Sequence, residues 1–299
     1  MTINDADWAG LIATRRREPD RLRAALANRP RRELLTDDRL LIVAADHSAR
    51  GVLGVPEDPT AIADRRRTLE ALMVALANPG VDGLLASPDI AEELALLGAL
   101  DNRLVFGTMN RGGLAGARWE LDDRMTAYRV DRLRELGLDG AKVLLRLADN
   151  DPATAPTIES VAKAVDDCGR AGLPIMVEPL PFTRDSSERV VPLEGDEALM
   201  RAIGIATALG STSTSTWLKV PTGHDMRRVM AATSLPTLLL GGNPSSDPEA
   251  TYRSWSAAME IEQIFGLVVG RSLLYPVDGD VDGAVRRAVQ VVRPERSTA

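Results

Sequence analysis

The sequence predicts an α/β protein, a (β/α)8 or TIM barrel with an N-terminal helical extension. Three observations support this: eight short apolar runs bounded by turn residues, stretches with helical spacing between them, and no GxGxxG motif after the first run. The 299 residues suit one such barrel, which typically occupies about 250 residues. A doubly wound sheet is the alternative, and the count of eight runs favours the barrel.

The eight runs are candidate strands. They are rich in Val, Ile and Leu and do not alternate with polar residues, as expected for parallel strands that are covered on both faces. In chain order the candidate strands are 40–46, 83–88, 103–109, 140–147, 173–180, 216–222, 236–242 and 266–273.

Helical spacing is clearest in four of the stretches between these strands. Two of them end at a glycine, Gly137 and Gly172, and we expect both glycines to serve as helix C-caps. The four predicted helices are 60–78, 120–137, 157–172 and 247–263.

Residues 1–36 precede the first strand and are predicted to form one or two arginine-rich amphipathic helices. We therefore divide the chain into a helical extension, 1–36, and a barrel domain, 37–299. The extension is expected either to cover the bottom of the barrel or to form a contact in a homo-oligomer.

Composition excludes several classes of protein. Hydrophobic residues make up 44% of the chain and charged residues 26%, so a full core can form and disorder is not expected. The net charge of −7 argues against a nucleic-acid surface, which needs a basic face. No apolar run approaches the roughly 18 residues of a membrane span, and no secretory signal is evident. Cys168 is the only cysteine, which fits a reducing cytoplasm.

Lysine is rare in this chain. Of 36 basic residues 33 are arginine, and lysine occurs only at Lys142, Lys163 and Lys219. Arginine can replace lysine as a surface charge, but its guanidinium cannot form a Schiff base with a carbonyl. Each remaining lysine is therefore a candidate for chemistry, although Lys163 lies in a predicted helix and is expected at the surface.

Polar residues gather at the ends of the candidate strands, where barrel enzymes place their active sites. Because strand side chains alternate, Lys142 and Arg146 share one face of their strand, as do Met176 with Glu178 and Trp217 with Lys219. If these faces point inward, Lys142, Lys219 and Glu178 converge with Asp46. The alternative is a buried ion network with a purely structural role.

This set of residues suits covalent chemistry at a ketone. A lysine that attacks a carbonyl must be neutral, and burial together with a second cation favours the neutral form. Lys142 could supply that cation for Lys219, and Glu178 could transfer the protons of imine formation.

A phosphate site is predicted at the last two strands. Gly241-Gly242 and Gly270-Arg271 combine backbone that an anion can approach with a fixed positive charge, although a Gly-Gly pair can also be a structural turn. His47 is expected to bind substrate or to donate a structural hydrogen bond, and two histidines, His47 and His224, are few for a zinc site. No metal or cofactor is predicted.

The distal end of a substrate, opposite the phosphate that the last two strands would bind, needs side chains of its own to bind it. Arg146 either binds a second anionic group there or pairs with Asp149. Arg111, in the loop after the third strand, is a second candidate to contact that end.

The motifs AADH, GAKVLLRL, IMVEPL, TWLKVPTG, LLLGGNPSS and VVGRSL occur in this order between residues 40 and 274. In this order they resemble the class I aldolase superfamily that includes tagatose-bisphosphate, deoxyribose-phosphate and archaeal-type fructose-bisphosphate aldolases. The resemblance implies Lys219 as the Schiff-base lysine, Lys142 as the second lysine, Glu178 as the acid and Asp46 as the first-strand aspartate. It assigns phosphate binding to Gly241, Gly242, Gly270 and Arg271.

The archaeal-type branch uses a tyrosine as proton donor, and only Tyr275 lies near a strand end here. The expected function is reversible cleavage of a phosphorylated ketose to dihydroxyacetone phosphate and an aldehyde. Two alternatives stay open: a lyase in which Asp46 and Glu178 hold Mg²⁺, and a non-catalytic barrel that binds a sugar phosphate.

Overall fold

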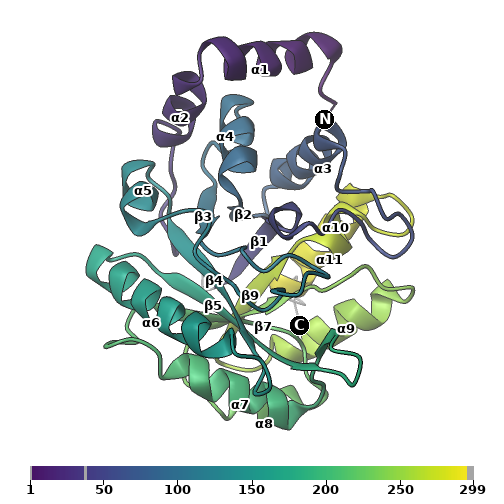
Figure 1. Cartoon of the computed structure of the whole chain (residues 1–299). Helices are drawn as coiled ribbons and strands as arrows, with labels where there is room; N and C mark the ends of the chain where they lie inside the picture. The colour runs from purple at the N-terminus through teal and green to yellow at the C-terminus, as the bar shows by residue number, and fades with distance from the viewer. Residues whose placement is uncertain (1, 37–38, 295–299) are drawn as a thin grey trace.

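The computed structural model describes residues 2–36 and 39–294, and Figure 1 shows helices arranged around a central set of strands. The strands are β1 (Leu40–Ala45), β2 (Gly83–Ala86), β3 (Leu104–Thr108), β4 (Gly140–Leu147), β5 (Ile175–Arg184), β6 (Val190–Pro192), β7 (Thr216–Val220), β8 (Thr237–Leu240) and β9 (Ile264–Val269).

Eight of these strands close a parallel barrel. The order β4-β3-β2-β1-β9-β8-β7-β5 is completed by pairing between β4 and β5, where Lys142 is in register with Met176. The short β6 pairs antiparallel with the end of β5 and lies outside the barrel. The predicted TIM barrel is confirmed, and all eight candidate strands contribute to it.

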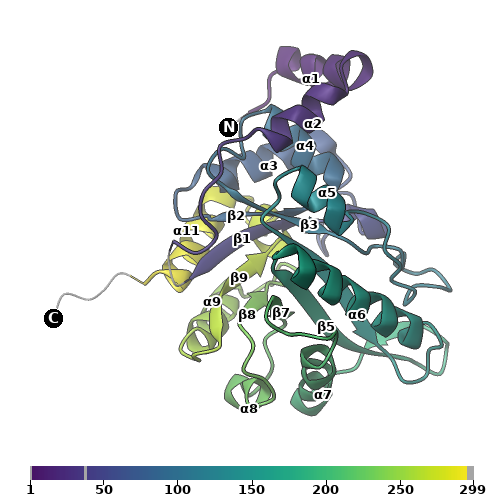
Figure 2. The same cartoon turned by 90° about the vertical axis from the view of Figure 1, so that its left-hand side faces the viewer.

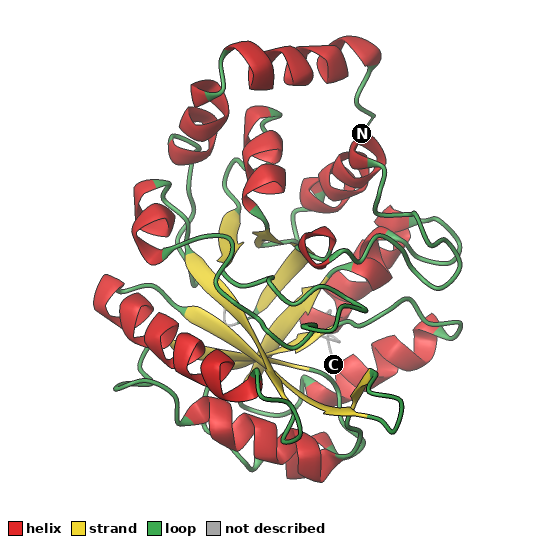
Figure 3. Cartoon of the chain, viewed as in Figure 1, coloured by secondary structure: helices red, strands yellow, loops and turns green. Residues whose placement is uncertain are grey.

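The helices that follow the N-terminal pair lie around the strands (Figure 3). They are α3 (Arg65–Ala77), α4 (Pro88–Leu96), α5 (Val130–Glu135), α6 (Thr154–Ala171), α7 (Asp196–Thr207), α8 (Met226–Met230), α9 (Pro248–Ala258), α10 (Arg271–Leu274) and α11 (Val281–Val292), with a 3-10 turn at Ser48–Arg50. Both predicted cap glycines adopt the left-handed conformation, Gly137 with φ of 63° and Gly172 with φ of 66°.

The barrel encloses a small apolar layer of its own. The inward side chains of β5, β7 and β8 include Met176, Trp217 and Leu238, and Phe106 of β3 lies 5.9 Å from Trp217 between ring centres. The other faces of the strands pack on the helices in a larger core. Because Met176 and Trp217 point inward, Glu178 and Lys219, two residues further along, point inward as well.

Several predicted elements differ from the structure in their bounds. The eighth strand, expected over 266–273, ends at Val269, and residues 271–274 form α10. The helix expected over 120–137 is present only in α5, and the residues before it form a loop held by an isolated bridge between Asn110 and Met125. The fifth strand runs on to Arg184 and forms a hairpin with β6, beyond its predicted end at residue 180.

The N-terminal helices α1 (Asp5–Arg17) and α2 (Asp20–Ala27) precede β1 and lie beside α3 and α4 (Figure 2). Arg15 of α1 pairs with Glu93 of α4 at 2.9 Å. The segment that follows runs under the barrel, where buried Arg29 pairs with Asp139 at 2.9 Å and Leu34 packs on the interior layer. The boundary predicted between residues 36 and 37 falls at the undescribed residues 37–38.

No helix in the described part of the chain combines the length and apolar character needed to cross a membrane.

Candidate active site

Four of the predicted side chains meet inside the barrel, where Lys142 is in register with Thr108, the last residue of β3. Asp46 follows β1, Lys142 lies on β4, Glu178 on β5 and Lys219 on β7. Lys142 and Asp46 are completely buried, and Lys219 and Glu178 retain 5% and 7% of their exposure. Charges this deeply buried are stable only when they are paired.

Glu178 is shared by the two lysines. Its Oε1 accepts a hydrogen bond of 2.9 Å from Nζ of Lys219, and its Oε2 forms an ion pair with Lys142. Nζ of Lys142 lies 3.6 Å from Oδ2 of Asp46. A single carboxylate therefore links the two amines, and a second carboxylate lies on the far side of Lys142.

Arg111 completes the network. It lies in the loop after β3, is 6% exposed, and forms an ion pair with Asp46. Opposite charges thus alternate from Lys219 through Glu178, Lys142 and Asp46 to Arg111. From the sequence, Arg111 is predicted only as a contact for the distal end of a substrate. Its pairing with Asp46 could not be predicted, because the two residues are 65 positions apart and a contact over that separation leaves no periodic pattern in the sequence.

The network changes the proton affinity of its members. Burial would raise the pKa of Asp46, but Arg111 and Lys142 lower it well below its ordinary value. Burial would also raise the pKa of Glu178, and the two lysines again lower it. Burial, followed by the charge of Arg111, lowers the pKa of Lys142 to about 8. Lys142 can therefore exchange a proton close to neutral pH.

Several polar atoms of this region have no hydrogen-bond partner among the described residues. Proteins normally satisfy such buried atoms, so each of them has bonding capacity left for a polar partner. Besides Nζ of Lys142 and Oε2 of Glu178, which form an ion pair with each other, the atoms are Oδ1 of Asp46, Nε of Arg111, Nε of Arg271 and Oγ of Ser272.

The residues predicted to bind phosphate lie together beside Asp46, Lys142, Glu178 and Lys219, which we call the tetrad. A Cβ atom on Gly270 would lie 2.5 Å from the carbonyl oxygen of Ala44 and 2.8 Å from Cε1 of His47, and one on Gly241 would lie 2.8 Å from Oγ of Ser272. Gly242 adopts the left-handed conformation with φ of 68°. The ends of β8, β9 and β1 can approach this closely only because glycine occupies the contact points.

Arg271 and His47 lie at the same place. Burial lowers the pKa of Arg271, and the carboxylates of Glu178 and Asp46 act against this shift. Burial lowers the pKa of His47 to about 3, although Asp46 opposes the change. His47 is therefore neutral at pH 7, and Arg271 carries the positive charge of this side of the barrel.

Arg146 belongs to a different cluster. Its completely buried guanidinium donates two hydrogen bonds, of 2.8 and 2.9 Å, to the carboxylate of Asp123, and another to the carbonyl oxygen of Glu120. Of the two alternatives for Arg146, the pairing with Asp149 is wrong, because Arg146 pairs with Asp123 and Asp149 pairs with Arg201 at 3.0 Å. Arg146 thus holds the loop after β3, and Asp123 is the residue that the sequence analysis missed.

Three other residues considered from the sequence lie away from the tetrad. The hydroxyl of Tyr275 is hydrogen-bonded to Thr68 at 2.8 Å. Lys163 forms an exposed pair with Asp167 on α6, and His224 is exposed.

A family model described as Cgl0159-like matches residues 38–289. The chain belongs to the Cgl0159-like family. The crystal structure of Cgl0159 from Corynebacterium glutamicum is 45% identical, has a TM-score of 0.94, and is matched over 98% of its own length and 97% of this chain. A comparison with curated proteins found no match.

The fold of this Cgl0159-like protein is shared with class I aldolases. A Schiff-base-forming fructose-1,6-bisphosphate aldolase is 19% identical with a TM-score of 0.66, over 91% of this chain and 99% of its own. A fructose-bisphosphate aldolase from Slackia heliotrinireducens is 16% identical with a TM-score of 0.61, and the match covers 100% of this chain and 96% of that aldolase. Identities this low show a common fold and leave the activity of the Cgl0159-like chain to be argued from its site.

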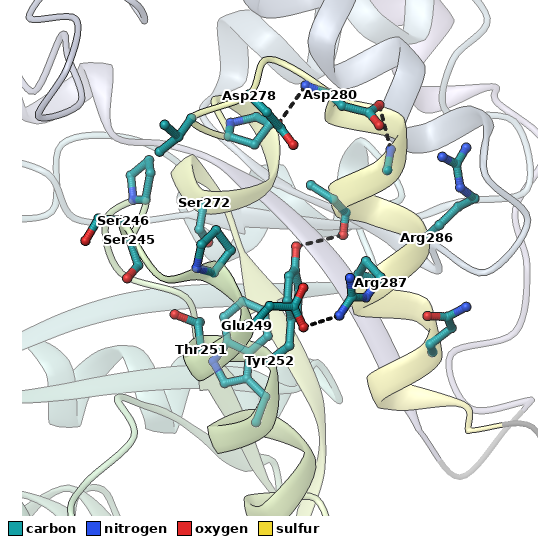
Figure 4. A pocket seen from close by; sticks show the side chains of 18 residues that line it. Ser245, Ser246, Glu249, Thr251, Tyr252, Ser272, Asp278, Asp280, Arg286 and Arg287 are labelled. Carbon is teal, nitrogen blue, oxygen red and sulfur yellow. Dashed lines mark hydrogen bonds and ion pairs between the residues drawn. The ribbon is translucent and has the colours of Figure 1, made fainter.

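A cavity of about 560 Å³ lies between α9 and α11, outside the ring of strands (Figure 4). Its wall includes Tyr252, and Arg287 lies over the Tyr252 ring while pairing with Glu249. None of the four tetrad residues lines it, although Ser272 and residues 244–246 of the loop that follows Gly241-Gly242 do. The tetrad is therefore the candidate site of this Cgl0159-like protein, and the cavity lies apart from it.

Proposed function

We propose that this protein is a class I aldolase that cleaves a phosphorylated ketose reversibly through a Schiff base on Lys219. The observation that carries the proposal is the position of Glu178 between Lys219 and Lys142, inside a barrel whose lysines are otherwise almost absent. The products would be dihydroxyacetone phosphate and an aldehyde.

Each step of the reaction has a group in position. The neutral amine of Lys219 attacks the ketone carbon, and Glu178, whose Oε1 lies 2.9 Å from Nζ, can move a proton from the nitrogen to the former carbonyl oxygen to give the carbinolamine. A second proton, which Lys142 can supply, lets the hydroxyl group leave as water and gives the iminium. The iminium then takes up the electron pair of the breaking carbon–carbon bond as an enamine, while the hydroxyl proton of the other half passes to a base and leaves an aldehyde. Lys142, with its pKa of about 8, can supply or accept a proton at neutral pH.

The glycines and Arg271 would hold the phosphate of the ketone half. The buried polar atoms without partners support a polar ligand at this place, and the charge of Arg271 supports an anionic one. Holding the phosphate would keep the ketone next to Lys219 and so raise its effective concentration.

The donor set supports the Mg²⁺ alternative less well. Asp46 and Glu178 each already face cationic side chains, and among residues 2–36 and 39–294 no three His, Cys, Asp or Glu side chains gather as metal ligands do. Cleavage that is lost with a chelator and retained in Lys219→Arg would favour that alternative.

Trapping tests the covalent step directly. Dihydroxyacetone phosphate with borohydride should add an irreversible mass to Lys219, and mass spectrometry should find Lys142 and Lys163 unmodified. Lys219→Arg keeps the charge next to Glu178 but cannot form an imine, so trapping and cleavage should vanish while the melting temperature changes little. Labelling at Lys142 would reverse the roles of the lysines, and no labelling would refute the proposal.

A further inference from the structure

We infer that the site is built for a ketose that carries one phosphate, and that a second phosphate on the substrate weakens binding. The inference rests on the proposed function and deepens it by naming the substrate class. It is carried by the balance of charged side chains inside and around the barrel mouth.

The tetrad and its neighbours carry an excess of positive charge. Four cations, Lys142, Lys219, Arg111 and Arg271, face two carboxylates, Asp46 and Glu178, so the excess is two positive charges. A phosphate monoester carries a charge of roughly −2 near neutral pH. One such group balances the excess in a site from which water is largely excluded.

The position of that phosphate follows from which cation lacks a partner. Lys142, Lys219 and Arg111 each form an ion pair with a carboxylate of the tetrad. Arg271 forms no ion pair within the described part of the chain, and its buried Nε has no hydrogen-bond partner there. The positive charge that has no carboxylate partner therefore lies beside Gly241 and Gly270, at the ends of β8 and β9.

The opposite side of the barrel mouth, around Arg146 and Arg50, has no comparable excess of positive charge. Arg146 pairs with Asp123, and Arg50 donates to the carbonyl oxygen of Gly113 at 3.1 Å and lies 3.4 Å from Glu120. Arg184, further out, pairs with Asp151 at 2.6 Å. A second phosphate on this side would meet arginines that are already neutralised, together with their carboxylates, and like charges in close contact disfavour binding.

The charge of Lys219 changes during the proposed reaction. Before attack, the neutral amine of Lys219 leaves an excess of one positive charge, and the iminium restores the second. One phosphate of charge about −2 therefore leaves a net charge of about −1 before attack and about zero in the iminium, whereas two phosphates would leave about −3 and −2. Arg118, in the exposed part of the loop after β3, is solvated and adds little to binding.

The experiment uses the full-length protein and two ligands that cannot form imines, a hexitol 1-phosphate and the corresponding hexitol 1,6-bisphosphate. Each competes with dihydroxyacetone phosphate in borohydride trapping, and the readout is the inhibition constant. We expect the monophosphate to bind at least about tenfold more tightly, a factor that corresponds to about 1.4 kcal/mol. Equal or tighter binding of the bisphosphate, or no competition by either, would overturn the inference.

A pair of variants tests the cause. Glu120→Gln removes a carboxylate from the distal side but keeps an acceptor for the amide of Gly116, 2.7 Å away, so the preference for the monophosphate should shrink. Glu197→Gln removes an exposed carboxylate of α7 that pairs with Arg228, and its preference should equal that of the wild type. An unchanged preference in Glu120→Gln would contradict the charge argument.

The two levels of the proposal can fail separately. If dihydroxyacetone phosphate is trapped on Lys219 and the bisphosphate competes better, the inference is wrong while the aldolase proposal stands. If nothing is trapped on Lys219, both are wrong.

Discussion

Oε1 of Glu178 lies 2.9 Å from Nζ of Lys219, and the other oxygen of the same carboxylate contacts Lys142. The two amines therefore compete for one negative charge inside a barrel whose floor is apolar. A proton that leaves either lysine has Glu178 as its nearest acceptor.

Glu178→Gln should slow imine formation by about 100-fold or more, because the amide cannot exchange a proton with Lys219. It should also lower the melting temperature, since Lys142 then keeps only Asp46 at 3.6 Å. The measurements are the rate of dihydroxyacetone phosphate trapping and thermal unfolding. A trapping rate equal to that of the wild type would remove Glu178 from the proton-transfer step.

The stability of the protein should depend on pH through Lys142. Its pKa falls from an ordinary value of 10.5 to about 8 in the folded protein, so between these values the unfolded chain binds more protons. The free energy of unfolding contributed by this lysine should therefore rise as pH increases from 8 to 10.5. Wild type and Lys142→Met should be compared by denaturant unfolding across this range. A constant difference between them would show that Lys142 does not titrate there.

Removing one partner of the buried pair Arg146–Asp123 should be costly. Asp123→Asn or Arg146→Met leaves a buried charge uncompensated, for which about 3–5 kcal/mol of unfolding free energy is expected. Lys163→Met breaks an exposed pair with Asp167 and should change stability by no more than about 1 kcal/mol. Chemical denaturation of the three variants measures these free energies. Equal losses of unfolding free energy in all three would mean that the buried pair of Arg146 and Asp123 does not hold the loop in place.

Two glycine substitutions should have opposite effects. Gly270→Ala brings a Cβ atom to 2.5 Å from the backbone oxygen of Ala44, so the strand ends must separate, and both stability and affinity for phosphate should fall. Gly204→Ala, in α7, meets no atom within 4 Å and should stabilise the protein by about 0.5–1 kcal/mol through helix propensity. Thermal unfolding and phosphate competition in the trapping assay would measure both. A Gly270→Ala variant with unchanged phosphate affinity would contradict the proposed phosphate site at the glycines and Arg271.

The sequence was sufficient to predict the barrel and the inward face of each strand at the site. Runs of Val, Ile and Leu mark buried parallel strands, and alternation along them places Met176 with Glu178 and Trp217 with Lys219. These signals are local, and for that reason they survive in a single sequence.

The loop after β3 could not be predicted in the same way. Residues 120–137 have helical spacing, but Asp123 is held by Arg146 from the next strand, and Thr126 and Ala127 donate their amides to the carbonyl oxygen of Met109. The pairing of Arg111 with Asp46 spans 65 residues. Interactions between segments this far apart override helical propensity and leave no pattern in the chain.

The contacts that hold the loop after β3 in place also determine where its sequence can change. Gly113 and Glu120 are held by the guanidinium groups of Arg50 and Arg146, while Leu114 and Trp119 between them are exposed by 40% and 57%. Because the short stretch between the anchors carries none of the buried pairs, we expect insertions and substitutions there to leave the tetrad in place. It is therefore the position at which related sequences, or a protein engineer, can alter this surface without rebuilding the buried ion pairs.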